Sequence, residues 1–419
     1  MTATPDGTGR SGQPGNRSWA ATARCTVAGL LLVLLLAAPA AADLTIFFPS
    51  SASIASTGVM DMAEGENGEI YFATDAGLSV YRDGWTTLRT TTPLASGSLL
   101  SDHVLAVETD HRGFAWVGYP NGLQVLAGPE ITTIQDQQFL KNLNINALYR
   151  SGEDMWVATG SAGVQRWHNG TWHRFAPWGE EGLGAYDVRS IAQDPESGSL
   201  YFSSADNGVW VAYPYPDRVS FTRLIAPVTE DPDWLRLRPD PLGGIYLFNR
   251  STILHHSLPQ GIRPVPSAQE SLAAGNTLYD LTISRTGALW LGTGDGMYGM
   301  AEGHEAVHLD ALDGIGPHAV KRIFADRQGR IWFVTGDRVG FLPGTMAEGT
   351  PVPVHVVETG GAVATPPVPT PYRTSAPPLP TPVISVEVSP LEDHTTPGSL
   401  PGFLSDLSRW LERLFGQNR

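Results

Sequence analysis

Seven times along this chain an aromatic residue closely follows a Gly-containing turn and is flanked by apolar residues. The successive separations of these aromatics are 45, 40, 45, 45, 44 and 42 residues. A period in the forties, with short strand-like runs and turn residues in between, is typical of one four-stranded sheet repeated around an axis. The seven aromatic residues, called the anchors below, are Tyr71, Trp116, Trp156, Tyr201, Tyr246, Trp290 and Trp332.

The sequence therefore predicts an all-β fold, a seven-bladed β-propeller over residues 43–348. The repeat around Trp116 shows the expected plan, with four short runs between residues 103 and 134 separated by Gly, Asn, Asp or Pro turns. We name these strands inner, second, third and outer, and the anchor lies on the second. The fifth repeat is the weakest, because Pro239 and Pro241 crowd its first turn.

A ring of sheets must close, since an open edge exposes unpaired backbone groups. The run Leu44–Phe48 precedes the first complete repeat and resembles an outer strand without a sheet. We expect it to complete the last sheet, whose third strand would follow Gly340. The alternative is that residues 353–357, with the sequence PVHVV, take this place.

The first 42 residues have the features of a targeting segment. Three Arg precede an apolar run at 27–38 that only Gly29 interrupts, and small residues follow at 40–42. The run is shorter than the ~20 residues of a membrane-spanning helix, so residues 1–42 are predicted to be a signal peptide, with an uncleaved anchor as the alternative. The single cysteine, Cys25, lies in this segment. We expect a secreted or cell-surface protein whose mature part has no disulfide.

Charge argues against nucleic acid as a partner. Residues 1–42 contain three Arg and one Asp, so the remainder has 24 basic against 41 acidic side chains and a net charge of −17. Phosphate backbones require Lys and Arg to displace their counterions, and an acidic surface repels them.

The C-terminal part has two further predicted segments. Residues 349–400 are rich in Pro and have no periodic apolar face, which predicts a disordered linker. Residues 401–416 place Phe403, Leu407, Trp410, Leu411 and Leu414 on one stripe, which predicts a short amphipathic helix. This helix could dock on a protein partner, on a membrane surface or back on the ring.

Three segments share a motif in which an apolar run, a Gly turn and apolar-Trp-apolar follow one another: VETDHRGFAWVGYPNGL (107–123), LTISRTGALWLGTGDGM (281–297) and IFADRQGRIWFVTGDRV (323–339). The motif resembles the repeat of the two-component regulator propellers, which are periplasmic or extracellular sensor domains of hybrid sensor kinases. The resemblance covers about residues 43–345. It implies a ligand-binding propeller, here without the kinase and membrane helix of those receptors, and therefore a recognition module that could serve a separate signalling protein.

Loops that start the inner strands gather at one mouth of a propeller channel, where polar and aromatic side chains suit a carbohydrate, a peptide or a protein partner. We expect an extracellular ligand of this kind at that mouth. The predicted ligand-binding residues are His103, Asn144, Tyr186, Asp187, Asp233, Trp234, Tyr279 and His318.

No catalytic residue, metal site or cofactor is predicted, because the sequence has no recognisable motif for one. The acidic and amide residues of the second-to-third turns are interpreted as turn formers, since calcium needs several oxygens at one point. Two alternatives to a binding module stay open. One is a secreted lyase or hydrolase for a polysaccharide or small molecule, using His103 with Asp187 or His318 at the same mouth. The other is a structural scaffold.

Overall fold

The described part of the chain is built almost entirely of β-strands. The structure, a computed structural model, describes residues 44–178, 182–214, 219–226, 234–272, 276–301, 304, 306–344 and 354–356. The predicted signal peptide at 1–42, the predicted helix at 401–416 and all of the predicted linker except 354–356 lie outside the described residues. Asp233, one of the predicted ligand-binding residues, also lies outside them.

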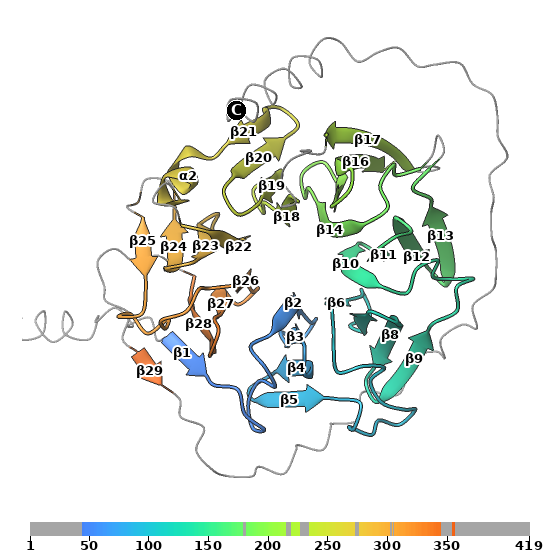
Figure 1. Cartoon of the computed structure of the whole chain (residues 1–419), viewed down its shortest axis with the longest axis horizontal. Coiled ribbons are helices and arrows are strands. Elements are labelled where there is room, and N and C mark those ends of the chain that lie inside the picture. Colours follow the sequence, from blue (N-terminus) through green and yellow to red (C-terminus); the bar gives the residue numbers. More distant parts are fainter. Residues whose placement is uncertain are drawn as a thin grey trace, which may run out of the picture. The chain divides into compact units, whose positions relative to one another are not determined.

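The described strands form seven sheets, six with four strands and one with five. Each sheet is an antiparallel meander in chain order from the inner strand outward, and the sheets surround a common centre (Figure 1). Inner strands of consecutive sheets are in contact, and β26 of the last sheet also contacts β2 of the first, so the ring is closed. The predicted seven-bladed propeller is thus confirmed.

The inner and second strands of each blade lie nearest the centre, and their apolar side chains face the neighbouring sheets. The inner strands are β2 (Val59–Glu64), β6 (Ala106–Thr109), β10 (Ile145–Ser151), β14 (Val188–Gln193), β18 (Arg236–Pro239), β22 (Leu278–Ile283) and β26 (Arg322–Ala325). The second strands are β3 (Ile70–Thr74), β7 (Ala115–Tyr119), β11 (Asp154–Thr159), β15 (Leu200–Ser204), β19 (Ile245–Phe248), β23 (Leu289–Thr293) and β27 (Arg330–Val334).

The two peripheral layers complete each blade. The third strands are β4 (Gly77–Tyr81), β8 (Gly122–Ala127), β12 (Val164–His168), β16 (Gly208–Pro214), β20 (Ile253–Ser257), β24 (Gly296–Met300) and β28 (Val339–Pro343). The outer strands are β5 (Trp85–Leu88), β9 (Glu130–Ile134), β13 (Thr171–Phe175), β17 (Val219–Ile225), β21 (Gly261–Pro264), β25 (Val307–Leu309) and β1 (Leu44–Phe47).

Strand β1 closes the ring from the other end of the domain. It pairs antiparallel with β28, with Thr45 opposite Phe341 and Phe47 opposite Val339. The seventh blade therefore takes its first three strands from the C-terminal side and its fourth from the N-terminal side (Figure 1). This arrangement confirms the predicted role of the Leu44–Phe48 run.

A fifth strand lies outside β1 in the same sheet. β29 (Val354–Val356) pairs with β1 in parallel, with Thr45 opposite His355. It belongs to the run that was the alternative closing strand. The two candidates are therefore both strands of this sheet, and β1 holds the fourth place while β29 adds to its edge.

The core lies between blades, because both faces of each sheet are covered by its neighbours. One apolar cluster joins Phe47 and Val339 of the last blade to Val59 and Phe72 of the first. Equivalent clusters join the other neighbouring pairs, and five of the seven anchors are buried. A strand buried on both faces is apolar along its length, which explains the continuous apolar runs of the sequence.

The repeated Gly-Trp motif has a physical origin in the turn that joins the inner and second strands. Asp110 accepts hydrogen bonds from the backbone amide of Phe114 (3.0 Å) and from the indole of Trp116 (3.2 Å). Gly113 has a φ of 79°, a conformation that favours glycine. The last blade repeats this turn with Asp326, which accepts a bond of 2.8 Å from the Trp332 indole. The carboxylate both caps the turn and satisfies the buried indole.

Helix is rare in the described residues. The only α-helix there, α2 (Pro266–Leu272), leads from β21 towards β22 and buries Ala268 and Leu272. No helix among these residues has the length and apolar character required to cross a membrane.

We predict that Phe47→Ala will lower the free energy of unfolding by about 3–5 kcal/mol, since the phenyl group is buried in the blade that closes the propeller. Phe47 is 5% exposed and lies 5.2 Å from the Trp85 ring, centre to centre. The neighbouring Phe48 is 42% exposed and contacts the Arg338 guanidinium, so Phe48→Ala should cost less than about 1 kcal/mol. Urea unfolding of both variants measures the difference. Equal losses would show that β1 does not close the ring.

Candidate functional site in the central channel

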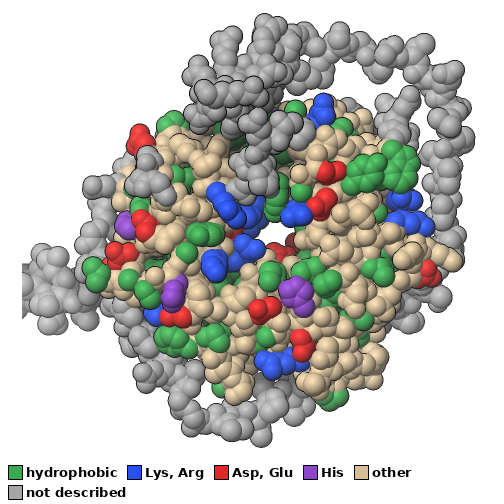
Figure 2. Space-filling model, viewed as in Figure 1, with side chains coloured by type: hydrophobic (Ala, Val, Ile, Leu, Met, Phe, Trp, Pro, Cys, Tyr) green, Lys and Arg blue, Asp and Glu red, His purple; other side chains and the backbone are tan. Residues whose placement is uncertain are grey.

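The inner strands enclose a cavity of about 750 Å³ along the axis of the ring, and all seven contribute side chains to it. Its lining runs from residues at the starts of the inner strands, such as Asn146 and Trp234, to residues after their ends, such as Arg285 and Arg327. We call the end where the inner strands start the first mouth. Figure 2 shows basic side chains gathered beside the central opening on one face.

Several polar side chains of the channel join one inner strand to the next. In each blade, one inner-strand residue pairs with the anchor on the second strand. Asp61, Ser190 and Asp280 each lie two residues before that residue on their inner strand. Each accepts a hydrogen bond from a backbone amide of the following inner strand. The donors are Val107 at 3.1 Å from Asp61, Leu237 at 3.2 Å from Ser190 and Ile323 at 3.4 Å from Asp280. These bonds hold neighbouring blades together.

Arginines occupy the same position in two other blades and face the carbonyl groups of the next strand. Arg236 donates to the carbonyl oxygen of Tyr279 at 2.6 Å, and Arg322 donates to that of Met60 at 3.1 Å. Arg238, two residues after Arg236, forms an ion pair with Asp280 at 2.9 Å. Three guanidinium groups therefore line the arc of the channel formed by β18, β22 and β26.

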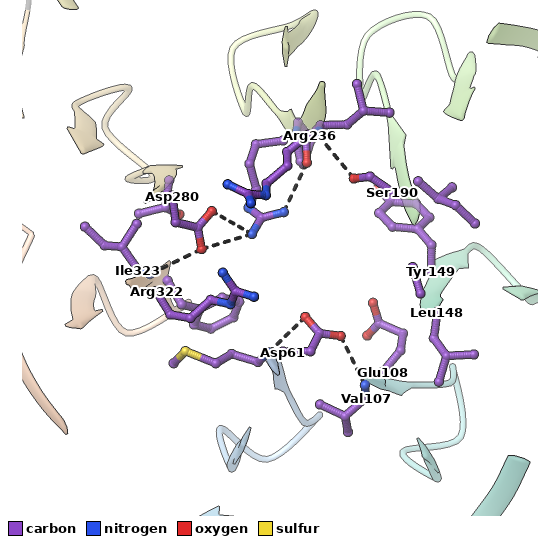
Figure 3. A pocket seen from close by; sticks show the side chains of 18 of the residues that line it. Asp61, Val107, Glu108, Leu148, Tyr149, Ser190, Arg236, Asp280, Arg322 and Ile323 are labelled. Carbon is purple, nitrogen blue, oxygen red and sulfur yellow. Dashed lines mark hydrogen bonds and ion pairs between the residues drawn. The ribbon is translucent and has the colours of Figure 1, made fainter. Parts of the chain in front are cut away.

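Two carboxyl groups lie on the neighbouring arc formed by β2 and β6. In Figure 3 the side chains of Asp61 and Glu108 point toward one another, while Arg322 and Arg236 approach the same space from other strands. Asp61 accepts bonds from two backbone amides, those of Met62 (2.9 Å) and Val107 (3.1 Å). Glu108 accepts one from its neighbour Thr109 (2.8 Å). No ion pair joins either carboxyl group to a cation among the described residues.

Burial raises the pKa of both acids. The pKa of Asp61 rises to about 6, because desolvation outweighs its two backbone hydrogen bonds and the positive charges of Arg238 and Arg322. Desolvation also raises the pKa of Glu108 to about 7, and the negative charge of Asp61 adds to the increase. The backbone hydrogen bonds from Thr109 and Arg150 and the positive charge of Arg150 lower it by less. Near pH 7 Glu108 is therefore protonated in part of the molecules, whereas an exposed carboxylate would be ionised.

The channel consequently carries opposite charges on neighbouring arcs. One arc carries a carboxyl pair without a cation, and the other carries guanidinium groups, of which Arg322 has no carboxylate partner among the described residues. Such walls can orient a polar ligand, and a carboxyl pair of this kind can also exchange protons with one. Within the described residues, no group of three or more His, Cys, Asp or Glu side chains is placed to hold a metal ion.

Of the predicted ligand-binding residues, Trp234 lines the cavity directly, with the Arg236 guanidinium 5.4 Å from its ring centre. Asn144 and Asp187 lie one step behind the lining. Both bond to Asn146, which donates to Asp187 at 2.8 Å and accepts from Asn144 at 3.2 Å. Asp187 also pairs with Arg189, 2.7 Å away, which lines the cavity.

The other predicted residues do not line the cavity. Tyr279 contributes its backbone carbonyl to Arg236. Tyr186 is 47% exposed and its ring lies 6.1 Å from that of Trp178, outside the cavity. His103 and His318 are exposed at the starts of their blades. The structure therefore brings Asn144 and Asp187 together at Asn146, places Trp234 against Arg236 in the lining of the same cavity, and leaves the two histidines and Tyr186 exposed outside that lining.

The charged residues of the channel were not among the predicted site residues. Asp61, Glu108, Arg236, Arg238, Asp280 and Arg322 sit inside inner-strand runs that are otherwise mostly apolar. Charged residues in such runs are unusual, because buried charges require partners. That signal was available in the sequence, whereas which charges face one another depends on the ring.

Two acidic residues of the second-to-third turns accept a hydrogen bond within their own turn, and Asp295 also accepts one from Asn276 in the segment before β22. Asp295 accepts a bond of 2.7 Å from Thr293, and Asp337 accepts one of 2.9 Å from Thr335. These bonds are local to each turn. The interpretation of these positions as turn formers agrees with this geometry.

No protein-family model matches the chain, and no curated protein matches it significantly. Solved structures do match. The extracellular domain of BT3049 from B. thetaiotaomicron, named as a hybrid two component system, is 15% identical with a TM-score of 0.57 and covers 70% of this chain. That of BT4673 from the same organism is 18% identical with a TM-score of 0.54 and covers 72%. This chain spans about two fifths of those chains, 41% and 39% respectively.

Virginiamycin B lyase from Staphylococcus aureus is matched over nearly its whole length, with 98% of that chain and 72% of this one covered. The identity is 14% and the TM-score 0.52. YCF48, solved with a D1 peptide, gives 15% identity and a TM-score of 0.52 over 97% of its chain and 74% of this one. At such low identities the matches establish the propeller fold. Sensor domains, a lyase and a peptide-binding protein share it.

We predict that replacing Glu108 by Gln will increase stability at high pH and leave it almost unchanged at low pH. An acid whose pKa rises on folding stabilises the protein fully below its unfolded pKa, and this contribution is lost as the pH rises through the folded value. For Glu108 the loss falls between its ordinary pKa of 4.5 and about 7. A difference of this size corresponds to roughly 1–3 kcal/mol.

Thermal unfolding of the wild type and of Glu108→Gln, measured near pH 5 and near pH 8, checks this expectation. Glu130→Gln, which changes an exposed carboxylate on β9, is the matched control and should follow the wild type. If the stability of Glu108→Gln falls with pH as much as that of the wild type, the carboxyl group of Glu108 is not destabilised by burial.

Proposed function

We propose that this protein is an exported recognition module that binds an extracellular ligand in the central channel, entering by the first mouth. The observation that carries the proposal is the cavity of about 750 Å³ whose walls hold carboxyl groups and guanidinium groups without full mutual neutralisation. Cavities of this size with a few convergent polar groups are the common form of small-ligand sites. The predicted signal peptide supports export.

Burial of charges without partners is costly for a fold that needs only packing to close its ring. Asp61, Ser190 and Asp280 have a structural role in joining blades. Glu108 accepts a hydrogen bond from its own neighbour in sequence, Thr109, and the backbone of Arg150 on β10 adds a further one that lowers its pKa. Burial still raises the pKa of Glu108 to about 7, so these bonds do not offset its desolvation, and a carboxyl group kept at that cost is best explained by a role in binding.

Trp234 supplies the aromatic surface at the first mouth. Its ring packs against the Arg236 guanidinium and lines the cavity. An aromatic face beside charged groups suits a ligand with both an apolar and a polar part, such as a small metabolite or the end of a peptide. The resemblance to sensor propellers supports the further possibility that the bound state is reported to a separate signalling protein.

A secreted lyase or hydrolase acting on a polysaccharide or small molecule is the second candidate, favoured by one observation. The Asp61 and Glu108 carboxyl groups have raised pKa values of about 6 and about 7, close to the range in which general acids and bases work best. In that case one carboxyl group would donate a proton and the other would accept one. Product formation from a bound compound, abolished by Glu108→Gln, would favour catalysis over binding alone.

We predict that a thermal-shift screen of extracellular metabolites, short oligosaccharides and peptides will yield a ligand whose binding depends on Trp234. Trp234→Ala should weaken binding about tenfold or more, because it removes one wall of the cavity. Trp178→Ala is the matched control, since that ring is 58% exposed and lies outside the cavity lining. His103→Ala tests the outer rim.

Loss of binding in Trp178→Ala or His103→Ala, with binding kept in Trp234→Ala, would move the site from the channel to the rim. A screen in which no compound stabilises the protein would count against recognition of small molecules in the channel. Turnover of a bound compound would reverse the ranking of the two candidates.

A further inference from the structure

From the arrangement of charge in the channel we infer that the ligand is a small zwitterion, with an ammonium group held between Asp61 and Glu108 and a carboxylate facing Arg322. This inference rests on the proposed function and names the chemical class of its ligand. It depends on charged residues without ion partners, on the positions of their strands and on the free-energy cost of burying these charges.

The carboxyl pair of Asp61 and Glu108 is assigned to the ammonium end of the ligand. Asp61 on β2 and Glu108 on β6 come from neighbouring blades, and Asp61 is close enough to raise the pKa of Glu108. The nearest arginine on the next strand, Arg150, directs its guanidinium to Glu66 at 2.6 Å instead. Two adjacent acids without a paired cation favour a ligand that supplies the positive charge.

The guanidinium arc is assigned to the carboxylate end of the ligand. Arg238 is paired with Asp280, so its charge is largely neutralised inside the protein. Arg322 is bonded only to carbonyl oxygens, those of Met60 and of its neighbour Lys321, among the described residues. Carbonyl groups orient a guanidinium without neutralising it, and a carboxylate is the group that best matches the remaining donors.

The protein's own charges could have neutralised one another, and their positions explain why they do not. Arg238 and Arg322 both lower the pKa of Asp61, so their positive charges reach its carboxyl group, yet neither forms an ion pair with it. The oxygens of Asp61 are instead occupied by the amides of Met62 and Val107. A ligand with opposite charges at its two ends would satisfy both arcs at once.

Proton release gives the inference a distinctive signature. An ammonium group beside Asp61 and Glu108 favours their ionised forms, so binding near neutral pH should expel protons that the free pair retains. The charged and titratable groups that face this pair are Arg150 and Tyr149 on β10, Arg238 on β18 and Arg322 on β26. Since Arg is always protonated and the pKa of Tyr149 is raised to about 12, the carboxyl pair is the source of the protons.

The test uses ω-amino acids from glycine to 6-aminohexanoate, with the amines and the carboxylic acids of the same chain lengths as single-charge controls. Titration calorimetry near pH 6.5 in two non-zwitterionic buffers of different ionisation enthalpy reports both affinity and proton release. We expect one ω-amino acid to bind at least about tenfold more tightly than its amine or its acid.

Variants then assign each end of the ligand. Glu108→Gln should weaken the best ω-amino acid about tenfold or more and reduce proton release to the smaller share that Asp61 supplies. Arg322→Gln should reduce the affinity of the amino acid to that of the amine and leave amine binding unchanged. Because Arg322 also joins β26 to β2, Arg322→Lys is a second variant that keeps the charge and should retain most of the affinity. Arg263→Gln, which changes an exposed arginine on β21 outside the cavity lining, is the matched control.

The inference is overturned if no ω-amino acid binds up to about 10 mM, or if the amine or the acid alone binds as tightly as the amino acid. Equal effects of Glu108→Gln and Arg263→Gln would also overturn it. If a neutral or doubly anionic compound from the screen binds in a manner that depends on Trp234, the recognition function stands and the zwitterion assignment falls. If neither the screen nor the series yields a ligand, both fall.

Discussion

The pairing of β1 with β28 is the interaction on which the rest of this structure depends. It joins residue 45 to residue 341, so strands from opposite ends of the domain share one sheet. Without that pairing the ring would have two free edges, and the apolar faces of the first and last blades would be exposed to water. With it, Phe47, Phe72 and Trp332 pack in one buried cluster, and all seven inner strands face a common axis.

Closure also explains why the channel is polar. Inner strands meet at the axis without pairing to one another as a sheet, so side chains such as Asp61, Ser190 and Asp280 provide hydrogen bonds between them. A polar channel is thus a structural requirement of the ring, and polarity alone is weak evidence for a site. The stronger evidence is charge that these bonds leave uncompensated, namely Glu108 and Arg322.

Much of the architecture could be predicted because each blade repeats the same local chemistry. The aromatic anchors mark the second strands, and the turn with Asp110 and Gly113 shows why an acid, a glycine and a tryptophan recur together. The sixth blade departs from this motif, and the same hydrogen bonds explain the result. In the sixth blade Ser284 replaces the acid, its hydroxyl bonds to the amide of Ala288, and the Trp290 indole nitrogen is left without a hydrogen-bond partner within the described residues. The site was predicted less well, since rim loops were chosen over the strand interiors.

The sequence by itself determined the number of blades and the position of each anchor and favoured the strand that closes the ring, because these depend on local periodicity and turn chemistry. Only the tertiary structure decided which charges share the channel. Asp61, Glu108, Arg238 and Arg322 are separated by up to 261 residues, and each lies on a different inner strand. Their meeting is set by the curvature of the ring and by the register of each inner strand, which no single repeat contains.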